Sequence, residues 1–296
     1  MTLVKNRIEL DALTAAETAL LSQQFSERIK LIFFDIDGTL LNSNIIVPAA
    51  VIAQIQRLQR GGIKMAIASG RPYFAAHYFT NDLSLDGPGL FCTGAMLYVP
   101  ERQQLLEKHP LDKQEVIRLA HLARVLDLHC ELYTEHDYYI EQQTDYSEYH
   151  AQYLGQAAKV KSFDNLLQSE TEILKALVAY EGSSGHEKYL QIQAALPKLH
   201  YAHGHGADRP NIYFTSIVSA QTNKKMAFKR LCLAHGVTAS QVLSVGDGDS
   251  DIDFITAAGV GIAMGNAKDD VKQHSDYVGK SVDAGGLEQI LRLIKP

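Results

Sequence analysis

The stretch Leu31-Ile32-Phe33-Phe34-Asp35-Ile36-Asp37-Gly38-Thr39-Leu40 determines the architecture that we expect for this chain of 296 residues. Its first four residues are apolar, and a short continuous apolar run is typical of a strand that is buried on both faces of a sheet. The run ends at Asp35, and a glycine follows at position 38. The sequence therefore places two carboxylates, those of Asp35 and Asp37, where a buried strand opens into a turn.

Three further apolar runs have the same character, and helical patterns separate them. The runs cover residues 63–68, 242–245 and 259–264, and the helical patterns lie at about 48–60 and 224–235. Buried strands that alternate with helices favour a parallel sheet covered on both faces. We therefore expect an α/β fold with a doubly wound, parallel-sheet core.

The middle of the chain differs in composition from the two flanking parts. Between about residues 100 and 207 it is richer in tyrosine, glutamine and histidine, and its predicted strands alternate apolar with polar residues. Alternation is typical of a sheet with one face in solvent, so we expect a smaller α+β domain there. The expected division is a helical N-terminal extension at 1–29, core segments at 30–99 and 210–296, and the α+β domain at 100–209.

Two local patterns refine this division. Thr14 followed by Glu17 matches a capping box, which predicts a helix that packs on the outside of the core. The histidines of His203-Gly204-His205, with Asp208 nearby, have the residue types of a metal site. The flanking glycines and the lack of a fourth ligand favour a flexible connection between the two domains instead.

Charge and composition exclude several classes of protein. The chain has 28 basic and 34 acidic residues, a formal net charge of −6, and no basic block of the kind that binds nucleic acid. No segment offers the roughly 20 apolar residues of a membrane span, and acidic residues in the first thirty positions argue against a signal peptide. Three widely spaced cysteines make a disulfide framework unlikely, so we expect a cytoplasmic protein.

Polar side chains stand at the ends of three predicted strands. Asp35, Ser69 and Asp247 occupy these positions, and Asp251 follows Asp247 by one helical turn. Ligands bind at the carboxyl ends of the strands in open α/β sheets, so we expect these side chains to meet in one crevice. Crowded carboxylates cannot all stay ionised without a compensating cation. Mg²⁺ suits such oxygen ligands, whereas no histidine or cysteine spacing near the aspartates indicates zinc.

Four motifs follow one another along the chain. They are Asp35-Ile36-Asp37-Gly38-Thr39-Leu40-Leu41, Ala68-Ser69-Gly70-Arg71-Pro72, Asn223-Lys224, and Gly246-Asp247-Gly248-Asp249-Ser250-Asp251, which is followed by Ala263-Met264-Gly265-Asn266-Ala267. In this order they resemble the haloacid dehalogenase-like (HAD) hydrolases, specifically the Cof-type phosphatases, from Lys30 to the C-terminus. The resemblance implies a Rossmann-like core with an α+β cap domain inserted after the second motif.

The resemblance also implies a role for each matching residue. Asp35 is expected to be the nucleophile that forms an aspartyl-phosphate, and Asp37 the general acid and then the general base. The phosphate-binding residues are expected to be Gly38, Thr39, Ser69, Gly70 and Lys224. Mg²⁺ is expected to bind Asp35, Asp247 and the carbonyl group of Asp37, with Ser250 and Asp251 close to the metal.

Three positions depart from the family pattern. Thr93 and Ser250 stand where the family usually has asparagine, and Lys225 stands where it usually has glycine. The function that we expect is Mg²⁺-dependent hydrolysis of a small phosphorylated metabolite, a sugar phosphate or a phosphorylated cofactor. A phosphomutase and a noncatalytic regulatory protein that binds a phosphometabolite remain as alternatives, and the oligomeric state stays open.

Overall fold

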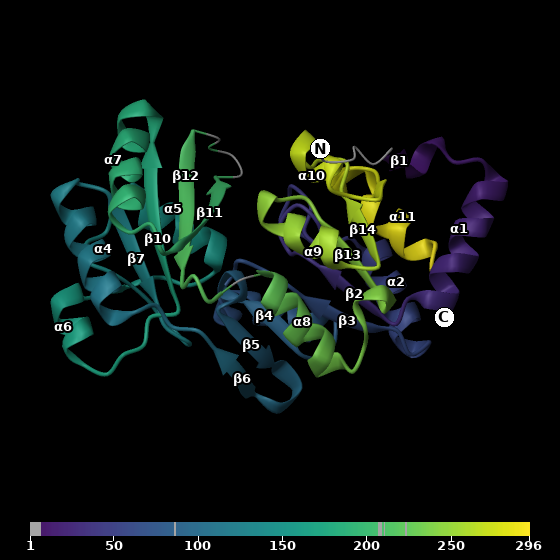
Figure 1. Cartoon of the computed structure of the whole chain (residues 1–296), viewed down its shortest axis with the longest axis horizontal. Coiled ribbons are helices and arrows are strands. Elements are labelled where there is room, and N and C mark those ends of the chain that lie inside the picture. Colours follow the sequence, from purple (N-terminus) through teal and green to yellow (C-terminus); the bar gives the residue numbers. More distant parts are fainter. Residues whose placement is uncertain (1–6, 86, 207–208, 210, 223) are drawn as a thin grey trace.

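Two units, each built around a sheet, lie side by side in the computed structural model (Figure 1). The structure describes residues 7–85, 87–206, 209, 211–222 and 224–296, and the side chains of residues 80–82, 224 and 225 lie outside that description. One unit, the core, contains a parallel sheet. The other, the inserted domain, spans residues 113–218 and contains a mostly antiparallel sheet. The α/β class, with a doubly wound core and a smaller second domain, is thereby confirmed.

The core sheet has six strands, and all its hydrogen-bonded neighbours run parallel. Across the sheet they are β1 (Ile8–Glu9), β15 (Tyr277–Val278), β14 (Val260–Ala263), β13 (Val242–Gly246), β2 (Leu31–Phe34) and β3 (Lys64–Ile67). The four strands expected from apolar runs are among them, and β2 has the expected bounds. Because β13, β2 and β3 are neighbours, their carboxyl ends lie next to one another.

Helices cover both faces of the core sheet, as the continuous apolar strands predict. Ile32 and Phe34 pack with residues of three helices, α1, α2 and α11. Leu31 and Phe33, which point the other way, pack with α8 and α9. The core helices are α1 (Ala15–Arg28), α2 (Ala49–Arg60), α3 (Tyr73–Asp82), α8 (Lys224–His235), α9 (Ile252–Ala257), α10 (Asp269–Gln273) and α11 (Gly286–Arg292).

Shorter elements complete the core. A three-stranded antiparallel sheet precedes the inserted domain, formed by β4 (Gly89–Phe91), β5 (Met96–Val99) and β6 (Gln104–Lys108). The 3-10 helices are η1 (Leu10–Ala12), η2 (Cys92–Gly94), η3 (Pro100–Arg102), η4 (Ala239–Gln241), η5 (Asp249–Asp251) and η6 (Val282–Ala284).

The N-terminal helix α1 begins where the capping box predicts and packs on the core. The hydroxyl oxygen of Thr14 accepts a hydrogen bond from the backbone N–H of Glu17 at 3.3 Å. The Glu17 carboxylate accepts one from the backbone N–H of Thr14 at 2.8 Å. Leu21 and Phe25 on this helix belong to the same hydrophobic cluster as β2. The extension is therefore part of the core packing.

The inserted domain is built on a second six-stranded sheet. Its strands, in spatial order, are β11 (His200–His205), β12 (Ile212–Val218), β10 (Lys175–Glu181), β7 (His129–Tyr133), β8 (Tyr138–Ile140) and β9 (Lys159–Val160). Its helices are α4 (Lys113–Val125), α5 (Asp145–Leu154), α6 (Phe163–Gln168) and α7 (Gly182–Ala195). Residues of α4, α6 and α7 form one hydrophobic cluster with the sheet. Helix α5 packs on the opposite face, together with Ala75 of the core helix α3.

Two expectations about this domain are wrong. The sheet does not have one solvent-exposed face along β7 and β10, because helices cover both sides of these central strands. Tyr133 and Tyr138 are consequently fully buried. The segment around His203 and His205 is not a flexible connection, because residues His200–His205 form the edge strand β11, paired along its length with β12. Asp208 lies outside the described residues.

The second domain boundary also falls inside this sheet. A boundary between residues 209 and 210 would separate β11 from β12, which are hydrogen-bonded neighbours. Strand β12 also pairs with β10, so the sheet continues to Val218. We therefore propose that the inserted domain ends after β12. We also propose that it begins after β6 and not at residue 100, because β5 and β6 pair with each other across that expected boundary.

No helix in the described part of the chain combines the length and the apolar character that crossing a lipid bilayer requires.

The packing of α1 predicts how substitutions on its two sides change the free energy of unfolding. Phe25 is buried against the ring of Tyr277, with the two centroids 5.7 Å apart in an edge-to-face arrangement. Phe25→Ala is expected to lower the free energy of unfolding by about 3–5 kcal/mol, because it leaves a cavity in the core. Leu20→Ala on the exposed side of the same helix should change it by less than about 0.5 kcal/mol. Urea denaturation of both variants measures the difference, and equal values would mean that α1 is not part of the core.

Candidate active site

The expected polar residues meet at the carboxyl edge of the core sheet. Asp35 follows β2, Ser69 lies just after β3, and Asp247 follows β13. All three line one cavity of about 380 Å³, together with Asp37 and Gly70. The inserted domain forms the opposite wall, so the cavity lies between the two units. The residues that it contributes include Tyr149, His150, Tyr153, Lys175, Leu177, His203, His205, Phe214 and Ser216.

Three carboxylates form a group whose geometry could hold a metal ion. Oxygen atoms of Asp35, Asp247 and Asp251 all lie within 4.8 Å of one another. Asp251 is buried, and its Oδ2 accepts hydrogen bonds from the backbone N–H groups of Asp247 at 3.1 Å and Gly248 at 2.9 Å. Asp251 thus stands directly in the acidic group, and the Ser250 hydroxyl donates to its Oδ1 at 3.4 Å.

The turn after Asp37 holds Asp247 in place. Thr39 donates its hydroxyl hydrogen to Asp247 Oδ1 at 2.9 Å. Gly38 has a φ of +72°, and a Cβ atom there would lie 2.2 Å from Asp247 Oδ2, so this position requires glycine. Gly38 and Thr39 are not among the cavity-lining residues, which include Ser69 and Gly70. In this structure the Thr39 hydroxyl supports an aspartate, and the expected contact of Gly38 and Thr39 with the phosphate stays a prediction.

Asn266 is a supporting residue to which the sequence analysis assigned no role. Its side-chain amide donates to the carbonyl oxygen of Gly38 at 2.9 Å and to Asp247 Oδ2 at 3.1 Å. The only sequence signal for it was its place in the segment that follows the fourth motif. Because one amide group joins the turn after β2 to the end of β13, Asn266 fixes the spacing between the two acidic loops.

The acidic group is electrostatically strained, as its crowding predicts. Burial raises the pKa of Asp35 well above its usual range, and the negative charges of Asp251, Asp37 and Asp247 add to this effect. Burial and the charge of Asp251 raise the pKa of Asp247 to about 7, against the stabilising hydrogen bonds from Thr39 and Asn266. A cation among these oxygens would offset the repulsion that contributes to both shifts.

Asp37 is paired with an arginine that sequence reasoning did not assign. Arg71 donates from Nη2 to Asp37 Oδ1 at 2.7 Å and from Nε to Asp37 Oδ2 at 2.9 Å. Its Nη1 donates to the backbone carbonyl oxygen of Tyr153 in the inserted domain at 2.8 Å, and the guanidinium lies 3.9 Å from the centroid of the Tyr153 ring. Arg71 is only 4% exposed. Although burial opposes it, the Asp37 carboxylate raises the pKa of Arg71.

Ser69 and Thr93 lie on the same side of the cavity. The hydroxyl oxygen of Ser69 accepts a hydrogen bond from the backbone N–H of Arg71 at 3.2 Å. The backbone N–H of Thr93 donates to the Ser69 carbonyl oxygen at 3.2 Å. Thr93 has a φ of +58°, a left-handed conformation that asparagine adopts more readily than a β-branched residue. The departure from asparagine at this position therefore adds local backbone strain.

The expected lysine remains a prediction. Lys224 is the first residue of α8, but its side chain and that of Lys225 are outside the described part of the structure, as is Asn223. The contact between Lys224 and a phosphoryl group therefore rests on the motif alone.

Known proteins with similar sequences include hydrolases, among them phosphatases. A family model described as haloacid dehalogenase-like hydrolase matches residues 32–291. A pyridoxal phosphate phosphatase of Escherichia coli is 25% identical, over 84% of this chain and 92% of its own length. A 5-amino-6-(5-phospho-D-ribitylamino)uracil phosphatase of Bacillus subtilis is also 25% identical, over 88% of this chain and 96% of its own length.

Solved structures share the arrangement of both units. A haloacid dehalogenase-like hydrolase from Bacteroides thetaiotaomicron superposes with a TM-score of 0.79, at 26% identity, over 90% of this chain and 99% of that one. A sugar phosphatase of HAD subclass IIB has a TM-score of 0.78 at 23% identity, over 89% of this chain and 98% of its own, and is similar in fold. Because the family model matches residues 32–291, which include the inserted domain and every aspartate of the cavity, the chain belongs to the haloacid dehalogenase-like hydrolases.

Proposed function

We propose that this hydrolase is a Mg²⁺-dependent phosphatase that removes the phosphoryl group from a small metabolite through an aspartyl-phosphate on Asp35. The observation that carries the proposal is the group of Asp35, Asp247 and Asp251 oxygens within 4.8 Å, of which Asp35 and Asp247 line one cavity with Asp37. The phosphatase names of two relatives that align over most of their length support the same reaction class.

The acidic group suits a hard divalent cation. Its donors are carboxylate oxygens, and burial together with the neighbouring negative charges raises the pKa of Asp35 and of Asp247. Asp35, Asp247 and Asp251 would hold Mg²⁺, together with the carbonyl group of Asp37 that the family motif suggests. When bound, Mg²⁺ would neutralise these carboxylates and the phosphoryl oxygens of the substrate.

The chain's own residues would carry the reaction in two steps. In the first, a carboxylate oxygen of Asp35 attacks phosphorus, the bond to the ester oxygen breaks, and the carboxyl proton of Asp37 passes to that oxygen. In the second, the Asp37 carboxylate takes a proton from water as the water oxygen attacks phosphorus, which releases phosphate and restores Asp35. Arg71, which lies 2.7 Å from Asp37 Oδ1, would stabilise the carboxylate form of Asp37 that the second step needs.

The wall of the inserted domain favours a leaving group that contains a ring. Tyr149, Tyr153 and Phe214 bring aromatic side chains to the cavity, and His150 lies among them, 5.1 Å from the Phe214 ring by centroids. Aromatic surfaces bind flat rings by stacking. We therefore place a phosphorylated cofactor with a planar ring ahead of a simple sugar phosphate as the substrate class.

The proposed roles of the two aspartates predict different losses of activity. Asp35→Asn should abolish phosphate release, by at least about 10³-fold, because the nucleophile is lost. Asp37→Asn should lower the rate by about 10²–10⁴-fold for alkyl esters and much less for p-nitrophenyl phosphate, whose leaving group needs no proton. Phosphate release from both ester types, with Mg²⁺ and with chelator, measures this.

Asp253→Asn is the matched control, because Asp253 is an exposed aspartate one turn from the cavity loop. It should keep wild-type rates. Undiminished hydrolysis by folded Asp35→Asn protein would contradict the proposal, as would equal losses of Asp37→Asn on both ester types.

The charge cluster also predicts how stability depends on pH. Without metal, folded Asp247 keeps its proton up to about pH 7, whereas the unfolded chain releases it near its ordinary pKa of 3.8. The folded state therefore binds more protons over this interval, and stability should fall as pH rises from about 4 to about 7. Asp247→Asn should reduce this decline.

Urea denaturation in chelator at several pH values between 4.5 and 7.5 measures the decline. Added MgCl₂ should restore stability most at the high end of this range, because Asp247 loses its proton there and becomes able to bind the cation. A wild-type decline that neither Asp247→Asn nor MgCl₂ alters would contradict the assignment of these carboxylates to a metal site.

A further inference from the structure

Lys175, the first residue of β10, places a buried positive charge in the wall of the cavity. Its side chain is 3% exposed and lines the same cavity as Asp35 and Ser69. The ammonium group donates to the carbonyl oxygen of Gly70 at 3.1 Å and lies 4.4 Å from the centroid of the Tyr133 ring. A strand of the inserted domain thus brings an ammonium group to the core loop that contains Ser69.

This charge is only partly compensated by its surroundings. An ammonium group has three hydrogen atoms to donate, and burying it is costly unless it is paired. Lys175 forms no ion pair within the described part of the chain, where its contacts are one carbonyl oxygen and one ring face. Burial accordingly lowers the pKa of Lys175.

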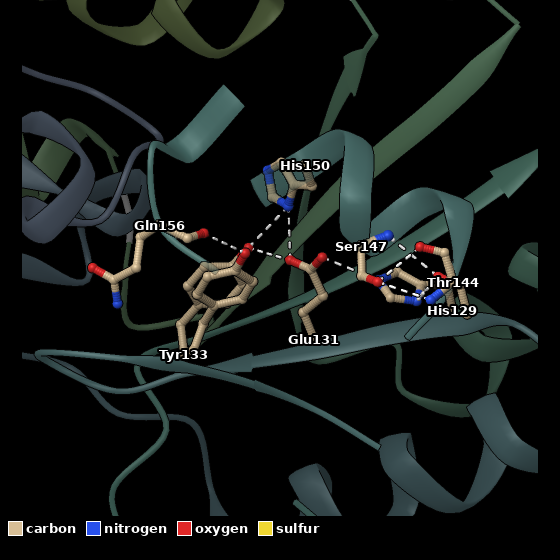
Figure 2. A network of polar contacts seen from close by, with 8 residues as sticks. His129, Glu131, Tyr133, Thr144, Ser147, His150 and Gln156 are labelled. Atoms are coloured by element: carbon tan, nitrogen blue, oxygen red, sulfur yellow. Dashed lines mark hydrogen bonds and ion pairs between the residues drawn. The ribbon is translucent and has the colours of Figure 1, made fainter. Parts of the chain in front are cut away.

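Glu131, the buried acid of the same domain, differs from Lys175 because its charge is matched by hydrogen-bond partners. Glu131 is 0% exposed, and its carboxylate accepts hydrogen bonds from Nε2 of His129 at 3.0 Å and Nδ1 of His150 at 2.8 Å (Figure 2). The hydroxyl of Tyr133 donates to the same carboxylate. Glu131 is thus satisfied by three side chains of its own domain, and this network fixes the Tyr133 ring whose face contacts Lys175.

The other described cations of the cavity are already held by carboxylates. Arg71 makes two hydrogen bonds to Asp37 and one to the Tyr153 carbonyl oxygen. Lys268 lies 2.9 Å from Asp249. Among these described cations, Lys175 is the one whose charge lacks a carboxylate partner, and it faces a cavity of about 380 Å³.

We propose that Lys175 binds an anionic oxygen of the phosphorylated substrate, so that the inserted domain contributes a positive charge to substrate binding. The proposal rests on the phosphatase function above, and it names a binding residue outside the four motifs. The oxygen belongs either to the phosphoryl group or to an anionic group on the leaving part of the substrate. Because Lys175 and Gly70 come from different units, such binding also holds the inserted domain against the core.

The test separates charge from structure. Lys175→Met removes the charge and keeps the side-chain length, whereas Lys175→Arg keeps the charge. Lys159→Met is the control, because Lys159 is a largely exposed lysine of the same domain that pairs with Asp137. For each protein, calorimetry gives the affinity for inorganic phosphate in MgCl₂, phosphate release gives KM and kcat on the best ester, and thermal unfolding gives Tm.

Lys175→Met is expected to weaken the binding of inorganic phosphate or to raise KM by at least about tenfold, because a charged contact is lost. Its Tm should not fall, since replacing a buried charge by an apolar side chain is often neutral or stabilising. Lys175→Arg should retain most of the affinity, and Lys159→Met should match the wild type. Weakened phosphate binding assigns the contact to a phosphoryl oxygen, whereas a raised KM with unchanged phosphate binding assigns it to the leaving group.

Phosphate affinity and KM within twofold of wild type in Lys175→Met would overturn the proposal, whatever happens to Tm. If this variant does not fold, Lys175→Gln takes its place, because glutamine keeps a donor for the Gly70 carbonyl oxygen without the charge. A wild-type protein that binds phosphate but hydrolyses no ester would refute the phosphatase function. The calorimetric affinities of wild type and Lys175→Met for inorganic phosphate would still decide the role of Lys175.

Discussion

Electrostatic repulsion among three carboxylates is the constraint around which the site is organised. Asp35 is far in sequence from Asp247 and Asp251, which follow β13 four residues apart, yet oxygens of all three lie within 4.8 Å. Hydrogen bonds from neighbouring groups stabilise the negative charges. The Thr39 hydroxyl and the Asn266 amide donate to Asp247, and two backbone N–H groups donate to Asp251. A glycine at position 38 leaves room for the Asp247 carboxylate. The parallel sheet supplies the position of the acids, and these donors supply their orientation.

The Ser69–Arg71 loop forms two buried polar contacts between the core and the inserted domain. Arg71 reaches from the core to the carbonyl oxygen of Tyr153, and Lys175 reaches from the inserted domain to the carbonyl oxygen of Gly70. Both donors are charged and buried, so each contact is stronger than it would be in water. The loop that carries the Ser69 hydroxyl is therefore held from both sides, and the general acid Asp37 of the proposed mechanism is tied to the same junction through Arg71.

The core and its acids were predictable because they depend on local patterns. A continuous apolar run marks β2, and the residue after such a run lies at the ligand-binding edge of the sheet, which places Asp35. The pairing of Arg71 with Asp37, the bridging by Asn266 and the contact of Lys175 with Gly70 depend instead on tertiary packing. The two-sided burial of β7 and β10 also escaped prediction, because the number of tyrosines does not reveal that α5 and the core cover the second face.

The order of strands in the core sheet has a consequence for how the chain folds as it is synthesised. Leu31 in β2 pairs with Val242 in β13, and the whole inserted domain is encoded between these two strands. One edge of β2 therefore stays without its partner until β13 has been made, whereas the strands of the inserted domain pair with one another over shorter stretches of chain. Contacts between distant parts of a chain form slowly, and unpaired edges favour aggregation. The inserted domain thus has the topology to fold first, and completion of the core sheet to follow it.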